Sequence, residues 1–262
     1  MSATPPWDRA ASLPVASGNR PRAEVVALGT ELPSVDGLFT FMRDAELRFD
    51  TLRMRIEERT WGARGEQVTN HELTLRHPGE ARVLSSEPSD GVGAPYRAWV
   101  SDGKTVQTYT SSRKVGTVRA VRPRVRGVGR QERDLPGSSL VYDPLTPLPA
   151  ESLPELFVHP AGFCQNVLGT GRLRVVGTDV VAGREAIVVE CDHPRTIEIA
   201  ADRADYRLLV AVDRADGVIL RLEESMGDLV TRIALVTEYS PDATLPPSAF
   251  AFVLPSGATR LY

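Results

Sequence analysis

The hydrophobic and polar residues change their spacing early in the chain, and this change predicts where a helix gives way to a strand. Apolar residues first recur at steps of three and four, the period of one helix face. They are Val35, Leu38, Phe39, Met42, Ala45, Phe49 and Leu52. Ser34 is a typical N-cap residue, and Asp36 in the first turn complements the helix dipole. The pattern predicts an amphipathic helix over residues 35–50.

The spacing then shortens to two. Residues 52–59 read Leu-Arg-Met-Arg-Ile-Glu-Glu-Arg, so that apolar and charged side chains alternate. Such alternation predicts a strand with one face in water. Glu57 and Glu58 are neighbours on this strand and face opposite sides, so they do not form a carboxylate pair by themselves.

The rest of the chain consists mostly of short alternating segments separated by turn signals. Three of these are His77-Pro78-Gly79, Ser101-Asp102-Gly103 and Ala182-Gly183-Arg184. The pattern predicts about ten or eleven strands, joined mainly as consecutive hairpins. Short helices are expected only near residues 153–158 and 162–168. Because strands do not alternate with long helices, a mainly β, antiparallel fold is predicted.

Composition divides the chain into an arm and one domain. Prolines and small polar residues dominate residues 1–33, which predicts a flexible arm, with residues 34–262 as a single domain. No apolar run reaches the roughly 18 residues of a membrane span, so no transmembrane segment is predicted. The N-terminus lacks a basic segment followed by an apolar one, so no secretion signal is predicted and a cytoplasmic location is expected.

Candidate chemistry is sparse. The four histidines are scattered, no serine lies in a Gly-x-Ser-x-Gly context, and no metal-ligand spacing occurs. Cys164 and Cys191 are expected to be reduced and buried in a cytoplasmic protein, and could form a disulfide in an exported one. We therefore expect no catalytic residues, no metal and no cofactor.

One basic segment stands out in a chain of net charge −3. Residues 113–134 contain eight basic residues and two acids, and Arg119, Arg122, Arg124 and Arg126 form its centre. Anionic lipid headgroups, nucleic acid or an acidic protein could bind such a segment. A solvated loop whose arginines pair with acids elsewhere is the favoured interpretation. Few aromatic residues interrupt the arginines, which argues against single-stranded nucleic acid.

Four features resemble the bacterial outer-membrane lipoprotein carrier (LolA-like) family, which includes the sigma-factor regulator RseB and the lipoproteins LppX and LprG. The first is the helix that runs into an arginine- and glutamate-rich strand, Phe39 to Arg59. The second is the Trp99–Lys104 hairpin leading to Tyr109, and the third is the Val176–Arg184 hairpin. The fourth is the closing series of segments, Leu209–Gly217, Ile219–Glu223, Val236–Tyr239 and Phe250–Gly257. The resemblance covers residues 35–258.

The resemblance implies an incomplete, strongly curved antiparallel β-barrel with helices covering its concave face. It also implies non-catalytic binding of a lipid, acyl chain or other hydrophobic ligand in an apolar cavity between sheet and helices. A regulatory protein-interaction module similar to RseB is the alternative, and that module would have a filled interior. The residues expected to cover the cavity are Phe39, Met42, Phe49, Phe157, Phe163 and Leu168. For each residue taken singly, simple core packing is the favoured interpretation.

Overall fold

The structure is a computed structural model that describes residues 28–63, 65–88, 94–121, 144–194 and 203–261. These residues form one twelve-stranded sheet, three α-helices and three short 3-10 turns. Residues 1–27 of the predicted arm lie outside the described part. None of the helices in the described ranges has the length and hydropathy needed to span a membrane.

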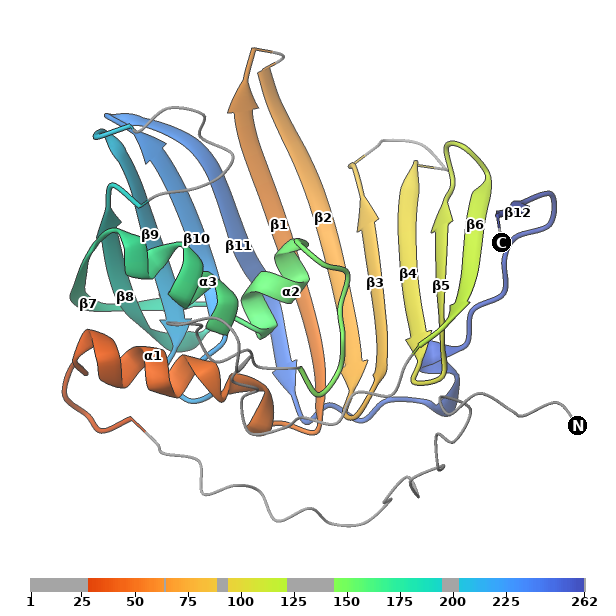
Figure 1. The fold of residues 1–262 in the computed structure, drawn as a ribbon, viewed down its shortest axis with the longest axis horizontal. Helices are drawn as coiled ribbons and strands as arrows, with labels where there is room; N and C mark the ends of the chain where they lie inside the picture. Colours follow the sequence, from red (N-terminus) through yellow and green to blue (C-terminus); the bar gives the residue numbers. More distant parts are fainter. Residues whose placement is uncertain (1–27, 64, 89–93, 122–143, 195–202, 262) are drawn as a thin grey trace, which may run out of the picture.

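The sheet is open, and its two ends are formed by β12 and β7 (Figure 1). Its order is β12-β6-β5-β4-β3-β2-β1-β11-β10-β9-β8-β7, and neighbours are antiparallel except for the parallel pair β12–β6. The strands are β1 (Thr51–Gly62), β2 (Gly65–Arg76), β3 (Glu80–Ser86), β4 (Tyr96–Asp102), β5 (Thr105–Thr110), β6 (Val115–Ala120), β7 (Arg172–Val181), β8 (Arg184–Asp192), β9 (Tyr206–Asp213), β10 (Ile219–Met226), β11 (Leu229–Pro241) and β12 (Thr259–Leu261).

The sheet curls strongly at its β7 end. Asp179 on β7 forms an ion pair of 2.8 Å with Arg221 on β10, although β8 and β9 lie between these strands in the sheet order. A flat sheet would keep β7 and β10 well apart, because adjacent strands are about 4.8 Å apart. The fold is therefore mainly β, open and curled like an incomplete barrel, as the sequence predicts.

The alternating pattern of the first strand is confirmed. Leu52, Met54 and Ile56 are buried, whereas Arg53 and Arg55 are exposed. The buried set faces the helices, and we call this side of the sheet the helix-bearing face. Because directly paired residues of adjacent strands point to the same side, the register extends this face across the whole sheet.

The predicted first helix is shorter than expected. Ser34 does cap it, accepting a hydrogen bond of 3.1 Å from the Gly37 amide. However, α1 (Val35–Arg43) ends seven residues before 50 and gives way to the 3-10 turn η2 (Ala45–Leu47). The guanidinium of Arg48 donates to the Phe41 carbonyl and lies 3.8 Å from the Phe41 ring centroid. It adds a second donor to this carbonyl at the helix end, which also accepts from the Asp44 amide at 3.3 Å, and the chain then turns into β1.

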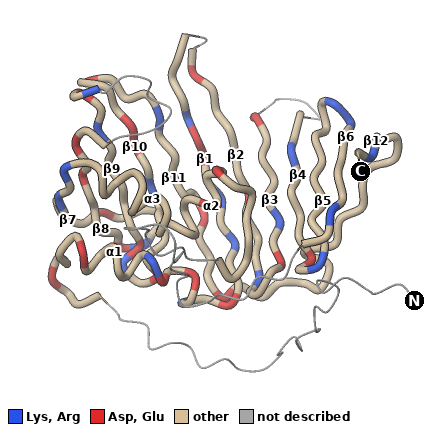
Figure 2. Tube along the Cα trace, in the orientation of Figure 1, with Lys and Arg blue, Asp and Glu red and all other residues tan. Residues whose placement is uncertain are grey.

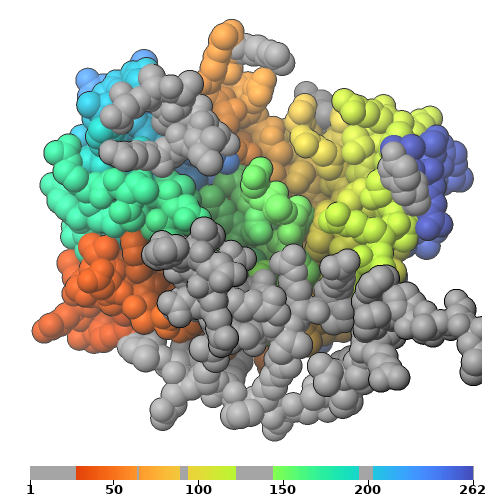
Figure 3. All heavy atoms as spheres, viewed as in Figure 1, coloured from red at the N-terminus to blue at the C-terminus, as the bar shows by residue number. Residues whose placement is uncertain are grey.

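The two later helices lie where they were expected, next to each other in the chain. They are α2 (Leu153–Val158) and α3 (Ala161–Asn166), followed by the 3-10 turn η3 (Leu168–Thr170). Figure 1 shows α2 in front of the middle of the sheet and α3 in front of β8–β10. Figure 3 shows the bright green atoms of the α2 region at the centre of this view, between teal-green atoms on the left and yellow atoms on the right.

The C-terminal segment packs on the opposite side of β4–β6. The ring centroids of Phe252 and Tyr109 are 6.5 Å apart. A Cβ atom added at Gly116 would lie only 2.4 Å from the Leu254 side chain. Glycine at position 116 thus permits this close approach. The 3-10 turn η4 (Pro247–Phe250) places Phe250 in a buried position, and β12, which the sequence pattern did not predict, adds an edge strand.

Candidate functional site

The six residues expected to cover a cavity do not all play the same part. Four are buried in the core cluster, and two are partly buried and pack against it. The buried residues are Met42, Phe49, Phe157 and Leu168, with exposed fractions between 0% and 2%. The partly buried ones are Phe39 and Phe163. The structure thus brings all six into or onto one core.

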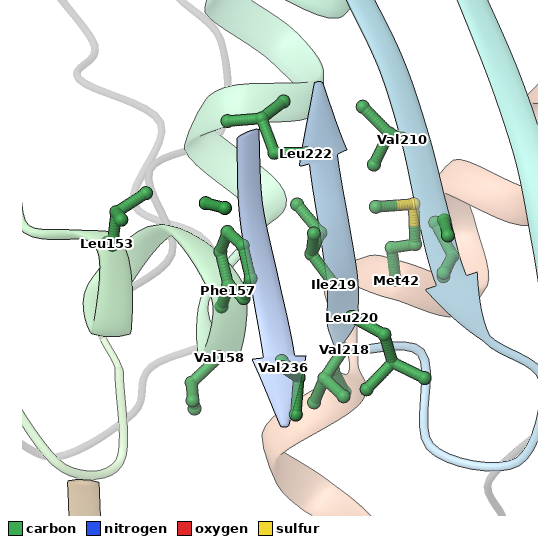
Figure 4. Packing of buried hydrophobic residues seen from close by; sticks show 14 of the residues in the cluster. Met42, Leu153, Phe157, Val158, Val210, Val218, Ile219, Leu220, Leu222 and Val236 are labelled. Atoms are coloured by element: carbon green, nitrogen blue, oxygen red, sulfur yellow. The ribbon is translucent and has the colours of Figure 1, made fainter. Parts of the chain in front are cut away.

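The low exposure of the four buried residues shows how they pack. A side chain that no water molecule can touch does not border a space that could hold water or an acyl chain. Figure 4 shows the ring of Phe157 between α2 and the strand that carries Val236. At these four positions the interface between helices and sheet is therefore filled by the protein's own side chains.

An open hollow lies instead between α1 and α3. Its volume is about 550 Å³, and we call it the α1–α3 hollow. Its apolar lining comes from Val35 and Phe39 of α1, Cys164 of α3 and Leu173 of β7. Its charged and polar lining includes Asp36, Arg43 and Gln165. The hollow is amphipathic, and one of the six predicted residues, Phe39, lines it.

The two cysteines, Cys164 and Cys191, are buried and free. Burial raises the pKa of Cys164 to about 12. Burial, followed by the charge of Asp192, raises the pKa of Cys191 to about 11. Both groups are thiols at neutral pH and not the thiolates that react as nucleophiles.

The helix-bearing face also carries a chain of hydrogen-bonded polar side chains that sequence reasoning missed. We call it the polar row, and it spans six strands from β9 to β3. Its members are Tyr206, Glu224, Arg232, Glu58, His71 and Ser85. In this order, the successive donor–acceptor distances are 3.1, 2.9, 2.8, 3.2 and 2.9 Å.

The signal for this row was present in the alternation of β1 and β2. Glu58 has the same phase as the buried Met54 and Ile56, so a charged group occupies a position on the apolar side. His71 likewise continues the phase of the buried Leu73. A charged or titratable residue in an apolar phase requires a buried partner. The partner, Arg232, comes from a strand 174 residues away, which a local pattern does not reveal.

The electrostatics of the row depend on Glu58. Burial by itself would raise the pKa of this carboxyl, but the hydrogen bond from His71 and the charge of Arg232 outweigh burial. The pKa of Glu58 therefore lies below its ordinary value, and the group is a carboxylate at neutral pH. With a neutral imidazole, Nε2–H of His71 donates to Glu58, and Nδ1 accepts from the Ser85 hydroxyl.

The order serine, histidine, carboxylate is that of serine hydrolases, but the surroundings differ from a catalytic site. Glu58 is shared with Arg232, and β3 is paired on both sides, so its backbone N–H groups are engaged in the sheet. No backbone donors of β3 are thus left to stabilise an oxyanion beside Ser85. Among the described residues, no group of His, Cys, Asp and Glu could hold a metal ion.

Replacing Glu58 with glutamine should change how stability depends on pH. Because the folded-state pKa of Glu58 is lowered, its contribution to stability is fully present above the unfolded-state pKa of about 4.3. The contribution is lost as pH falls through the lower folded-state pKa. We expect wild type to exceed Glu58→Gln in stability at neutral pH, and the difference to shrink in acid. Urea unfolding at a series of pH values measures it.

Glu57→Gln is the matched control for this experiment, because Glu57 lies on the other side of β1 and pairs with Arg59 near the surface. Its difference from wild type should be small across the same pH range. A stability difference for Glu58→Gln that did not vary with pH would contradict the role of the ionised carboxylate.

The predicted basic segment is described only in part. Arg119 lies on β6 and is exposed. Arg122, Arg124 and Arg126 lie outside the described residues. The first residue of the segment, Arg113, lies in the turn between β5 and β6.

Comparison of the sequence with protein-family models gives no match, and no curated protein matches it. Solved structures do match. The Pseudomonas aeruginosa complex of MucA and MucB matches with a TM-score of 0.45 and 15% identity, over 84% of this chain and 61% of that chain. LprF from Mycobacterium bovis has a TM-score of 0.39 and 10% identity, over 82% and 98%. A LolA superfamily protein from Nitrosomonas europaea has 0.29 and 11%, over 84% and 98%.

These structures belong to the group of proteins that the sequence resembles. Two further MucB structures also match, and this chain spans 60% and 65% of their chains. The chain therefore covers less than two thirds of each MucB chain that it matches.

Proposed function

We propose that the domain is a non-catalytic binding module and that it holds a hydrophobic ligand in the α1–α3 hollow. The observation that carries this proposal is the apolar lining that Val35, Phe39 and Leu173 give to an open space of about 550 Å³. Sites for small ligands usually measure about 300–1,000 Å³ and combine apolar walls with a few polar groups. Arg43 and Gln165 provide such groups for the polar end of an amphipathic ligand.

The proposed site lies on the outer side of the helices, whereas the sequence predicted a site on their inner side, between helices and sheet. The inner side is packed at Met42, Phe157 and Leu168, whose exposed fractions are 0%. The hollow reaches the surface between α1 and α3, so a ligand enters it without separating the helices from the sheet. An acyl chain or another slender apolar group is the ligand that such a space accommodates.

Replacing Phe39 with aspartate should weaken binding of a fluorescent fatty acid about tenfold or more, because the apolar chain would then displace water from a charged carboxylate. Fluorescence titration measures the dissociation constant, and native mass spectrometry of the purified protein tests for a lipid that co-purifies. Val253→Asp is the matched control, since it adds the same charge at an apolar side chain that is 86% exposed on the C-terminal segment.

The outcomes separate a ligand in the hollow from other possibilities. Loss of binding in Phe39→Asp with normal binding in Val253→Asp supports the hollow as the site. Equal binding in wild type and both variants places the ligand elsewhere. A wild-type protein that carries no lipid and takes up no fatty acid contradicts the proposal.

A protein partner is the second candidate, and the packed interior is the observation that favours it. A regulatory module of the RseB type was predicted to have a filled core, and four of the six expected cavity residues are buried in the core. This alternative gains support if fatty-acid binding is absent while a defined partner binds with micromolar or better affinity in calorimetry.

A further inference from the structure

Strands β4–β6 and their turns form a basic part of an otherwise slightly acidic protein. Residues 96–120 contain five basic residues and a single acid, Asp102. The basic residues are Arg97, Lys104, Arg113, Lys114 and Arg119. Figure 2 shows that basic and acidic residues are intermixed over β1, β2 and β7–β11 and that blue segments dominate β4–β6.

These basic side chains differ from most arginines of the sheet in having no acidic partner. Arg55, Arg184 and Arg232, for example, each form ion pairs with one or more carboxylates. Within the described residues, none of the five basic side chains of β4–β6 forms an ion pair. Their positive charge is therefore not neutralised within this part of the protein.

Two of the five line a hollow on the helix-bearing face. We call it the β2–β5 hollow, and its volume is about 420 Å³. Ser85, Arg97 and Thr110 are directly paired across β3, β4 and β5, so their side chains point to the same side in one line. Arg113 and Ser112 line the hollow from the turn that follows β5.

The hollow is preorganised by backbone contacts. The Ser111 amide donates to the Tyr96 carbonyl at 2.9 Å, and the Tyr96 amide donates to the Ser111 hydroxyl at 2.7 Å. The Thr259 amide donates to the Lys114 carbonyl at 2.8 Å, which ties the same turn to β12. These bonds hold Arg113 next to the start of β4, which carries Arg97. The backbone that carries both arginines is therefore ordered before a ligand binds, which lowers the entropy lost on binding.

We propose that the β2–β5 hollow binds a phosphate group. Guanidinium groups bind phosphate through paired, charge-assisted hydrogen bonds, and Arg97 and Arg113 provide two of them. The hydroxyls of Thr69, Thr110 and Ser112 supply further donors, and in the described residues they make no other hydrogen bond. This number of donors exceeds what the two oxygens of a carboxylate accept and suits a phosphate.

The polar row ends at the hollow and fixes one of its lining residues. Ser85 lines the hollow and is held by His71, which in turn is fixed by Glu58 and Arg232. Among the described residues that line the hollow, Glu87 is the only acid, and it is exposed. Two arginines and one glutamate leave a net positive charge for an anion.

This inference goes beyond the proposed function and does not depend on it. The β2–β5 hollow and the α1–α3 hollow share no residue. The phosphate group could belong to a lipid headgroup or to a small soluble molecule, and the chemistry of recognition is the same for both. The two sources are separated by the probes that bind.

The test uses the full chain and probes that differ only in the phosphate or its carrier. Inorganic phosphate and glycerol phosphate, measured by calorimetry, represent soluble sources. Vesicles of phosphatidylcholine, with and without phosphatidylglycerol, represent a lipid surface and are measured by flotation. The variants are Arg97→Gln and Arg113→Gln. Arg82→Gln is the matched control, because Arg82 lies on the opposite side of β3 and likewise forms no ion pair in the described part of the chain.

We expect each hollow variant to bind about tenfold more weakly than wild type. Arg82→Gln should stay within about twofold of wild type, and Glu87→Gln should bind more tightly because it removes the one acid. Binding of soluble phosphates identifies a free phosphate as the ligand, and binding of phosphatidylglycerol vesicles alone identifies a headgroup. An equal loss in Arg82→Gln, or no binding of any probe by a wild-type protein with normal unfolding, overturns the proposal.

Discussion

Arg184→Met is expected to lower the free energy of unfolding by about 3 kcal/mol. Arg184 is placed at the start of β8 and binds two carboxylates, those of Asp213 and Asp216. The side chain of Asp213 is 1% exposed. Removing the arginine would leave buried negative charges without their counterion, which is the costly way to break a buried ion pair.

The surroundings of Arg184 explain why this loss should be large. Asp213 also accepts hydrogen bonds from the amides of Ala215 and Asp216, which shape the turn between β9 and β10. Tyr239 of β11 donates to Asp216 at 3.1 Å, and its ring lies 4.7 Å from the Arg184 guanidinium. Burial and the neighbouring Asp213 raise the pKa of Asp216. One arginine thus joins β8, the β9–β10 turn and β11.

Urea unfolding followed by circular dichroism measures the effect. Arg174→Met is the matched control, because Arg174 also pairs with two carboxylates but is 61% exposed. Exposed pairs contribute about 1 kcal/mol or less. If the two variants lost the same stability, the Arg184 cluster would be no more than a surface ion pair.

The cluster of Arg184 with Asp213, Asp216 and Tyr239 shows which part of the fold a sequence can predict. The turn Asp213–Gly217 and the strands on both sides of it follow from local turn chemistry and alternation. The partners Arg184 and Tyr239 lie 29 residues before and 26 residues after Asp213, and no local pattern links them. Strands and hairpins are local and could be predicted. The pairing of charges across the curled sheet depends on tertiary structure and could not.

The candidate sites show the same division. The apolar phase of the first helix predicted that Phe39 and Met42 lie near the sheet, and both do. A pattern of apolar residues does not say whether a side chain borders an empty space or packs against a neighbour, because an apolar residue suits either position. Met42 proved to be fully buried, and Phe39 lines an outer hollow. The β2–β5 hollow was missed because its serine, threonine and arginine residues are ordinary for exposed strands.

Phe157→Ala is expected to lower the free energy of unfolding by about 3–5 kcal/mol, the loss typical of removing a buried ring. Phe157 is 0% exposed and belongs to the core cluster between α2 and the sheet. Phe39→Ala is the matched control. The Phe39 ring is only partly buried, so this variant should lose about 1 kcal/mol while weakening fatty-acid binding.

The Phe157 measurement also decides between the two interpretations of the interior. If α2 covered a cavity, the Phe157 ring would already border open space, and its removal would cost about 1 kcal/mol or less, because few contacts would be lost. If the interface is filled, the loss is large, and the variant gains an apolar cavity that can take up a small apolar molecule such as benzene. A large loss, together with benzene stabilising Phe157→Ala but not wild type in thermal unfolding, would show that the ring itself occupies the space where a carrier would hold its ligand.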